Sequence, residues 1–448
     1  MPLTPPRRAS CLAALLLLGV MGCKHPALQR TGASPSAPDM PSEWPTFQRD
    51  NARTGAQPDA PALRRKPTIL WSKPVGAQAA SHSPLLVGEL VIVASHGARG
   101  GADDASDGVV ALRRDTGERA WFWATREDVH TTAYASGVLI AAGARTTWAL
   151  DARTGALLWR AGHPRGHGAV HATLIVGDHV VLAHAKGHLV ARSLTRGAPL
   201  WHARLSGPVA RGLASASSVV LVGTLDGAVS AHDLDSGRPL WKTTLPDALR
   251  GAILAPPTIH NRHALISAST PSPGARSSML ALHMRDGALA WSTRHEANTS
   301  ALPGSSASAT IAHARYHLPL DGSTYLVGVA HANTAQLDYT ATTGPCLPTS
   351  PASPVATAGV VYLPRADGAL YAFSMDNSIA PGFGLWRLYL GDAAQTDRKL
   401  PAHLKALPKD RCPPTMPPLH PLLSTPAIGA NGDVFVTSAA GVLYRLGG

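Results

Sequence analysis

A repeated eleven-residue phrase constrains the fold of this 448-residue chain more than any other feature. In each copy an alanine is followed six residues later by a glycine and four residues after that by a tryptophan, as in Ala149, Gly155 and Trp159. The other copies are Ala111/Gly117/Trp121, Ala191/Gly197/Trp201, Ala231/Gly237/Trp241 and Ala281/Gly287/Trp291. Because three residue types do not recur at fixed spacing by chance, the sequence predicts an array of similar structural units.

Short apolar runs separated by turn residues lie between the copies. Residues 217–222 and 228–232 flank the turn-forming Gly223–Gly227, and similar strand–turn–strand patterns occur at 180–191 and 360–373. Such runs predict antiparallel strands joined by hairpins. Four short strands in each unit of about 40 residues are typical of a β-propeller, in which each unit is one blade.

Each residue of the phrase has an expected structural role. The alanine suits an inner strand packed closely by the neighbouring blade, and the glycine supplies a turn position with positive φ. The tryptophan is expected to bury about 150–250 Å² against the next blade. We therefore predict that seven tryptophans are structural docking residues: Trp71, Trp121, Trp159, Trp201, Trp241, Trp291 and Trp386.

The number of blades depends on how incomplete units are counted. Residues 336–344 read as a decayed copy without its tryptophan, and the copy ending at Trp386 carries an insertion. The last unit, 432–446, stops before an outer strand, whereas the strand at 67–71 has no unit ahead of it. If the N-terminal strand closes the C-terminal blade, the propeller has eight blades and no free sheet edge. Seven blades is the alternative, if 300–345 is an insertion.

The phrase resembles the tryptophan-docking motif of PQQ-like (quinoprotein-type) β-propellers, and residues 44–448 carry this resemblance. Residues 44–55 also resemble the segment that precedes the first blade in that superfamily. Together with the count of units, the predicted fold is an all-β, eight-bladed propeller of four-stranded antiparallel blades, with seven blades as the alternative. The chain is also similar in architecture to the propeller lipoprotein of the outer-membrane β-barrel assembly machinery.

The N-terminus predicts export and a lipid anchor. Residues 1–22 have a charged start and a leucine-rich core, and they end in Val20-Met21-Gly22 before Cys23, which resembles a bacterial lipobox. We expect Cys23 to be acylated, with an ordinary secretory signal as the alternative. Residues 23–43 then form the lipidated end and a Pro/Ser/Ala tether. Lys24 favours the outer membrane by the sorting rule of known lipoproteins, so we predict a lipid-anchored, periplasm-facing protein.

Two cysteines remain after the signal is removed and the anchor is formed. Cys346 and Cys412 both lie beside proline, and in an exported protein they are candidates for one disulfide. Two separate thiols is the alternative. The formal charge of +12 is spread over arginines in repeat turns, which indicates a solvated basic surface and no nucleic-acid partner.

The sequence predicts no catalytic, cofactor-binding or metal-binding residue. Quinoprotein dehydrogenases of the resembling fold carry adjacent cysteines and acidic calcium ligands, whereas this chain has no Cys-Cys pair. Asp151, Asp233 and Asp235 lie in repeat turns and are expected to cap backbone groups. No phosphate-binding Gly-Lys-Ser/Thr loop or Gly-x-Ser-x-Gly elbow occurs. We therefore expect a protein that is not an enzyme and needs no cofactor.

Histidines are abundant, 21 in all, with a concentration between residues 163 and 188. The members of this group are His163, His167, His171, His179, His184 and His188. They lack a paired carboxylate and a helical HxxxH spacing, so surface or channel-lining histidines are favoured over a weak metal site.

Two irregular segments are candidate interaction loops: residues 97–107, and the proline-rich residues 391–423. Taken together, the sequence predicts an envelope lipoprotein that acts as a protein-binding scaffold, with barrel-assembly components as candidate partners. The alternatives are a quinoprotein-type dehydrogenase and a periplasmic propeller that binds a ligand or polysaccharide.

Overall fold

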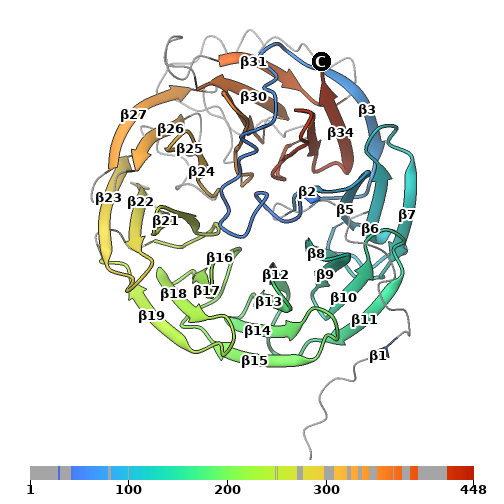
Figure 1. The fold of residues 1–448 in the computed structure, drawn as a ribbon, viewed down its shortest axis with the longest axis horizontal. Coiled ribbons are helices and arrows are strands. Elements are labelled where there is room, and N and C mark those ends of the chain that lie inside the picture. Colours follow the sequence, from blue (N-terminus) through green and yellow to red (C-terminus); the bar gives the residue numbers. More distant parts are fainter. Residues whose placement is uncertain are drawn as a thin grey trace, which may run out of the picture.

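A computed structural model shows a closed ring of antiparallel sheets (Figure 1). It describes residues 29–30, 42–78, 82–98, 100–247, 249, 251–269, 276–296, 307–319, 324–330, 335–342, 351–366, 368–375, 384–391 and 421–448. Within these ranges every regular element is a strand, and no helix is long and apolar enough to cross a bilayer. The predicted all-β propeller of four-stranded antiparallel blades is confirmed.

In the part of the chain that the structure describes, eight sheets make up the ring, and each begins with a strand at its centre and ends with one at its rim. The first four sheets in chain order contain β4 Leu85–Val87, β5 Leu90–His96, β6 Asp107–Arg113 and β7 Arg119–Ala124; β8 Val129–Ala135, β9 Val138–Gly143, β10 Thr146–Asp151 and β11 Leu157–Gly162; β12 Val170–Val176, β13 His179–His184, β14 His188–Ser193 and β15 Pro199–Arg204; and β16 Leu213–Ala216, β17 Val219–Gly223, β18 Ala228–Asp233 and β19 Pro239–Thr244. Two short strands, β1 Gln29–Arg30 and β2 Ser42–Trp44, pair with β11 and β4.

The remaining sheets complete the circle. They contain β20 Thr258–His260, β21 His263–Ser269, β22 Arg276–His283 and β23 Leu289–Glu296; β24 Thr310–Ala312, β25 Arg315–Pro319, β26 Thr324–Ala330 and β27 Ala335–Thr342; β28 Val355–Ala356, β29 Val360–Pro364, β30 Ala369–Ser374 and β31 Gly384–Tyr389; and β32 Ala427–Ile428, β33 Val434–Thr437, β34 Val442–Gly447 and β3 Thr68–Pro74. The sheet β24–β27 lies inside 300–345, so the segment that the seven-blade alternative treats as an insertion forms a sheet of the ring.

The two ends of the chain close the ring by sharing one sheet. Strand β3 pairs antiparallel with β34 from Thr68 opposite Gly447 to Pro74 opposite Val442. This pairing gives the C-terminal sheet the outer strand that its own sequence lacks. The ring therefore has no unpaired edge at the junction of its first and last units.

The repeated phrase joins each sheet to the next. In each copy the alanine is fully buried and pairs with the tryptophan, as in Ala191 opposite Trp201. The tryptophan ring then covers the glycine of the following copy. A Cβ atom added at Gly197 would lie 2.6 Å from atoms of the Trp159 ring, and the φ angle of Gly197 is +66°. Gly155 has the same relation to Trp121, at 2.7 Å and +74°.

Hydrogen bonds from the indole nitrogens reinforce the same contacts. Trp159 Nε1 donates to the Leu194 carbonyl at 2.8 Å, and Trp201 Nε1 donates to the Leu234 carbonyl at 2.7 Å. Equivalent bonds join Trp71 to Arg114, Trp241 to Met284 and Trp386 to Leu63. The tryptophans named here therefore lie in contacts between neighbouring parts of the ring.

Candidate functional site

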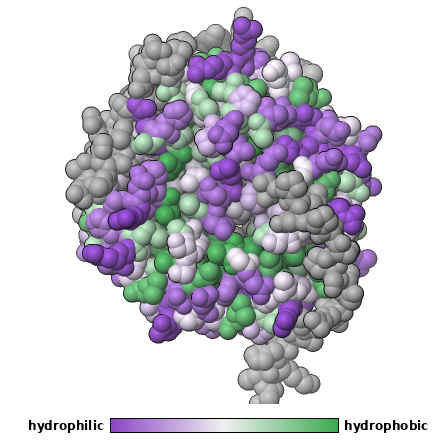
Figure 2. Space-filling view, viewed as in Figure 1, coloured by the Kyte–Doolittle hydropathy of each residue, from purple (hydrophilic) through white to green (hydrophobic). Residues whose placement is uncertain are grey.

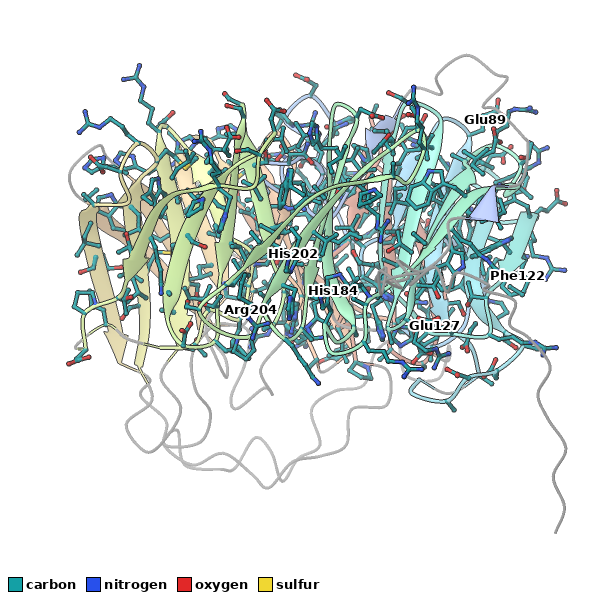
Figure 3. The ribbon with its side chains drawn as sticks, turned by 90° about the horizontal axis from the view of Figure 1, so that it is seen from below. Glu89, Phe122, Glu127, His184, His202 and Arg204 are labelled. Atoms are coloured by element: carbon teal, nitrogen blue, oxygen red, sulfur yellow. The ribbon has the colours of Figure 1, made fainter. Side chains whose placement is uncertain are left out.

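The ring has two faces, which differ in the connections that they carry. The first, the turn face, carries the hairpin turns that hold the glycines of the phrase. The second, the loop face, carries the connections from each sheet to the next and the β5–β6 and β13–β14 hairpins. In the side view of Figure 3, Glu89 lies towards the turn face, whereas Glu127, His184 and Arg204 lie towards the loop face.

An extended stretch of chain, the channel segment (residues 45–57), fills the centre of the ring. Figure 1 shows it as the blue trace that crosses the middle of the propeller. Its carbonyl groups accept hydrogen bonds from successive inner strands: Asn51 from Ser215 at 2.7 Å, and Ala52 from Ile259 at 2.8 Å. Further bonds of the segment reach β8, β12, β24 and β28. The channel segment therefore bonds to six inner strands, to five of them through its backbone and to β12 through the Asn51 side chain.

Arg53 anchors this segment from inside. Its side chain is only 2% exposed, and burial lowers the pKa of its guanidinium to about 10. The guanidinium donates to the carbonyls of Leu213 at 2.7 Å, Phe47 at 2.7 Å and Thr173 at 3.3 Å. A buried cation is tolerated here because backbone carbonyl oxygens surround it.

A small pocket lies beside Arg53. Its lining is Phe47, Arg53, Thr131, His171, Ala172, Thr173, Arg211, Gly212, Leu213 and Pro256. Arg211 donates to the Pro351 carbonyl at 3.0 Å, and burial lowers its pKa to about 10. His171 Nδ1 lies 2.9 Å from the Val209 carbonyl oxygen. The lining thus carries two cationic side chains and no carboxylate.

The first histidine cluster (His82, His96 and His130) lies near the loop face at the ends of β5 and β8. The ring centroid of His96 lies 4.9 Å from that of His82 and 5.2 Å from that of His130. Asp128 Oδ2 is 3.8 Å from His96 Nδ1. Burial lowers the pKa of His130 to about 4 and that of His82 well below its usual value, so these two rings are neutral at pH 7.

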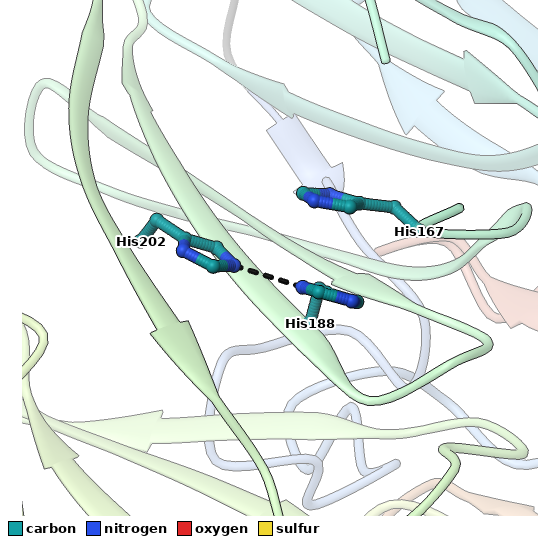
Figure 4. A group of neighbouring side chains, drawn as sticks. All are labelled: His167, His188 and His202. Carbon is teal, nitrogen blue, oxygen red and sulfur yellow. Dashed lines mark hydrogen bonds between the residues drawn. The ribbon is translucent and has the colours of Figure 1, made fainter. Parts of the chain in front are cut away.

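The second histidine cluster (His163, His167, His184, His188 and His202) is larger. The rings of His167 and His188 are stacked, with centroids 3.8 Å apart, and His188 Nδ1 lies 2.9 Å from His202 Nε2 (Figure 4). The His184 ring meets His163 and His167 edge-on at centroid distances of 4.8 and 5.2 Å. Burial lowers the pKa of His184 to about 3 and the pKa values of His163 and His188 to about 4.

The structure divides the six histidines that the sequence singled out. It brings four of them into the second cluster, places His171 in the pocket, and places His179 3.6 Å from Asp235 at the opposite end of β13. Sequence reasoning missed His202, which lies on the outer strand β15. The pairing register of the β14–β15 hairpin could have indicated that His202 lies near His188. In this register Val190 lies opposite His202 and His188 lies opposite Arg204.

Two of the acidic turn residues, Asp151 and Asp233, have the geometry of backbone caps. Asp151 accepts a hydrogen bond from the Thr154 amide at 2.9 Å, and Asp233 accepts one from the Ser236 amide at 2.9 Å. In the 97–107 loop, Asp104 accepts bonds from the amides of Ala98 and Ser106 at 2.9 and 2.6 Å. These carboxylates serve local structure.

Several predicted features fall outside the described residues. They are residues 1–22, Cys23, Cys346, Cys412 and most of 391–423. Both described ends of the last segment are tied to the same turn between β29 and β30. The Leu390 amide donates to the Gly368 carbonyl at 2.9 Å, and the Leu422 amide donates to the Arg365 carbonyl at 3.1 Å. The segment therefore begins and ends on the loop face.

Comparison with known proteins identifies the family. The family model described as outer membrane protein assembly factor BamB matches residues 62–211 and 195–446. The chain belongs to this family. No curated protein matches the sequence significantly.

Solved structures share the propeller at low sequence identity. BamB from Moraxella catarrhalis superposes with a TM-score of 0.59 at 18% identity, covering 85% of this chain and 97% of that chain. A europium-containing methanol dehydrogenase gives 0.63 at 13% identity, with 92% and 98% covered. The quinohemoprotein alcohol dehydrogenase from Comamonas testosteroni gives 0.67 at 13% identity, with 91% and 80% covered. At these identities the matches show the fold alone.

The central pocket does not fit the calcium-bound quinone that the resemblance to quinoproteins implies. Calcium requires several oxygen ligands, carboxylates foremost, whereas the lining residues include Arg53 and Arg211 and no carboxylate. The sequence also has no adjacent cysteine pair to lie over a quinone.

Proposed function

We propose that this protein is a non-enzymatic scaffold of the bacterial envelope that binds other proteins during outer-membrane protein assembly. Membership of the BamB family over residues 62–446 carries the proposal. The filled centre of the ring supports it, because the channel segment occupies the place where a propeller enzyme would hold a ligand. The available binding surfaces are then the outer surfaces of the ring. Figure 2 shows one face of the molecule, on which hydrophilic and hydrophobic side chains are interspersed.

The loop face is the binding surface that we propose. Loops on a rigid scaffold are where binding residues concentrate, and this face carries the 97–107 loop and both ends of the 391–423 segment. It also presents exposed charges of both signs, among them Asp103, Arg165 and Lys186. The turn face is built from tight turns whose residues are committed to docking and capping. A partner of the barrel-assembly machinery is therefore expected on the loop face.

We further propose that acylated Cys23 anchors the protein in the outer membrane, with the propeller facing the periplasm. Residues 24–43 then act as the tether between the anchor and the propeller, and Gln29–Arg30 within it pair with the outer strand β11. Cys346 and Cys412 are proposed to form a disulfide that joins two irregular segments.

Site-specific photo-crosslinking in intact cells tests the binding surface. A photoreactive amino acid at Arg165 or Lys186 on the loop face should give crosslinks to barrel-assembly components. Exposed Arg153 and Arg196 on the turn face are the matched controls. Crosslinks to these components from the turn face alone would refute the assignment of the face. Their absence from all positions, and from a pull-down out of detergent-solubilised envelopes, would refute the scaffold function.

A further inference from the structure

Three histidines of the second cluster bring their ring nitrogens together at the loop face. His167 lies in the connection that enters β12, His188 begins β14, and His202 lies on the outer strand β15. One ring nitrogen from each lies within 4.8 Å of the other two. His167 and His188 are partly buried and His202 is exposed, so solvent reaches the group. We propose that these three imidazoles form a binding site for a divalent transition-metal ion of the zinc or copper class.

The donor set selects this class of ion. Neutral imidazole suits zinc, copper and nickel, whereas magnesium and calcium need oxygen ligands, and none of the three donors is a carboxylate. Three histidines leave a fourth coordination position for water or for a ligand from another molecule. The site can therefore bind a metal ion without enclosing it.

The distances are close to those of a zinc site. Two ligands of tetrahedral zinc lie about 3.3 Å apart, given zinc–nitrogen bonds of about 2.0–2.1 Å. His188 Nδ1 and His202 Nε2 are already 2.9 Å apart. No two of the three nitrogens are more than 4.8 Å apart, so each separation must shrink by at most about 1.5 Å. Rotation of the His167 and His202 side chains can supply this change, because His167 is in a loop and His202 is exposed.

Hydrogen bonds of neighbouring residues fix the loop that carries His167. His184 Nδ1 lies 3.0 Å from the carbonyl oxygen of Gly168, the residue that follows His167. His163 is fixed by Thr147 Oγ1 at 2.8 Å and the Ala144 carbonyl at 3.2 Å. The loop that carries His167 is thus held at one end by His163 and at the other by His184. Rotation of the His167 side chain alone can then bring its ring to the metal.

Arg204 determines the protonation pattern of the metal-free site. A guanidinium can only donate, so its hydrogen bond with His188 Nε2 makes that nitrogen an acceptor. The proton of neutral His188 is then on Nδ1, which donates to His202 Nε2. For Nδ1 to bind a metal, this proton must move to Nε2 and Arg204 must withdraw. Arg204 therefore competes with the metal, both by this hydrogen bond and by its positive charge.

Zinc titration of the full-length protein, purified without a histidine tag, tests the site. ZnCl₂ titrated in a calorimeter should show one equivalent bound per chain, and Co²⁺ should give the intense visible bands of a four-coordinate site. His202→Ala and His167→Ala should each weaken zinc binding more than about tenfold. His179→Ala, on the same sheet but at its other end, is the control and should leave zinc binding unchanged.

The Arg204→Gln variant is expected to strengthen zinc binding, whereas the histidine variants weaken it. Removal of one positive charge about 5 Å from the doubly charged ion should tighten zinc binding by more than about tenfold, because the repulsion reaches that size even at the dielectric constant of water. Because Arg204 and His202 are exposed, these variants are expected to fold, and circular dichroism checks that they do. Absence of binding at about 100 μM zinc, or binding that both His202→Ala and His167→Ala leave unchanged, would overturn the proposal. Neither result depends on the scaffold function, since the measurement uses the purified protein and the metal alone.

Discussion

Substitution of Gly197 by alanine tests whether the tryptophan–glycine contact holds neighbouring sheets together. The added Cβ would lie 2.6 Å from Trp159 Cδ2 and Cε3, and the residue would keep a φ of +66°. Trp159 is only 2% exposed and its Nε1 bonds to the Leu194 carbonyl at 2.8 Å, so the ring has little room to move. The left-handed conformation costs an L-residue about 1–2 kcal/mol. Overpacking adds about 1–3 kcal/mol.

The expected loss for Gly197→Ala is therefore about 2–5 kcal/mol in the free energy of unfolding. Gly177→Ala in the same sheet is the matched control. Gly177 has a φ of +56°, but a Cβ atom there would have no neighbour within 4 Å. The control should lose only the conformational cost, about 1–2 kcal/mol. Both variants share the gain that alanine brings by restricting the unfolded chain, so their difference isolates the contact with Trp159.

Equilibrium urea unfolding, followed by tryptophan fluorescence and circular dichroism, measures this difference. Coincidence of the two probes checks that unfolding is two-state. Equal losses for Gly177→Ala and Gly197→Ala would refute the reasoning, because the indole contact would then contribute nothing. In a Trp159→Leu background the gap between the two variants should narrow, since a smaller side chain leaves space for the added methyl group.

Three further predictions follow from the ring, the histidines and the anchor. Deletion of residues 60–73 removes most of β3, exposes the edge of β34, and should yield aggregates by size-exclusion chromatography; a stable monomer would contradict ring closure. Burial lowers the pKa of His163 to about 4 and the pKa values of His184 and of His317, a buried residue of β25, to about 3, all below the unperturbed value of about 6.5. The stability of the fold should therefore be complete above pH 6.5 and fall as the pH drops towards 4, by up to about 1.4 kcal/mol per pH unit for each of these histidines. Urea unfolding that is independent of pH over this range would contradict this prediction. Cys23→Ser should abolish labelling with radioactive fatty acid and release the protein from the membrane fraction, and unchanged membrane association would refute the anchor.

The repeat was sufficient to predict the ring because the contacts of its residues lie within one sheet or between neighbouring sheets. Each alanine, glycine and tryptophan of the phrase acts within one sheet or on the next, and the spacing between copies is the length of one blade. Strand β3 could be assigned to the last sheet because Trp71 had no unit ahead of it and residues 432–446 lacked an outer strand. The sequence thus contained both halves of the closing blade.

The candidate site was less accessible from the sequence. The channel segment was noted only for its resemblance to a segment that precedes the first blade, and nothing in its residues showed that it bonds to six inner strands. His202 was not grouped with His167 and His188, and His82, His96 and His130 were not connected at all. Their proximity arises from hairpin register and from contacts between neighbouring sheets.

The sequence by itself determined the all-β class and the repeating blade, and it predicted a docking role for the tryptophans, since these depend on periodicity and on contacts between adjacent units. Only the tertiary structure decided that the centre of the ring is filled and that three imidazoles converge on the loop face. The physical reason is closure: when sheets are arranged around one axis, strand ends far apart in the chain meet at a common face. The distances between their side chains then depend on the twist and packing of whole sheets, which no local pattern specifies.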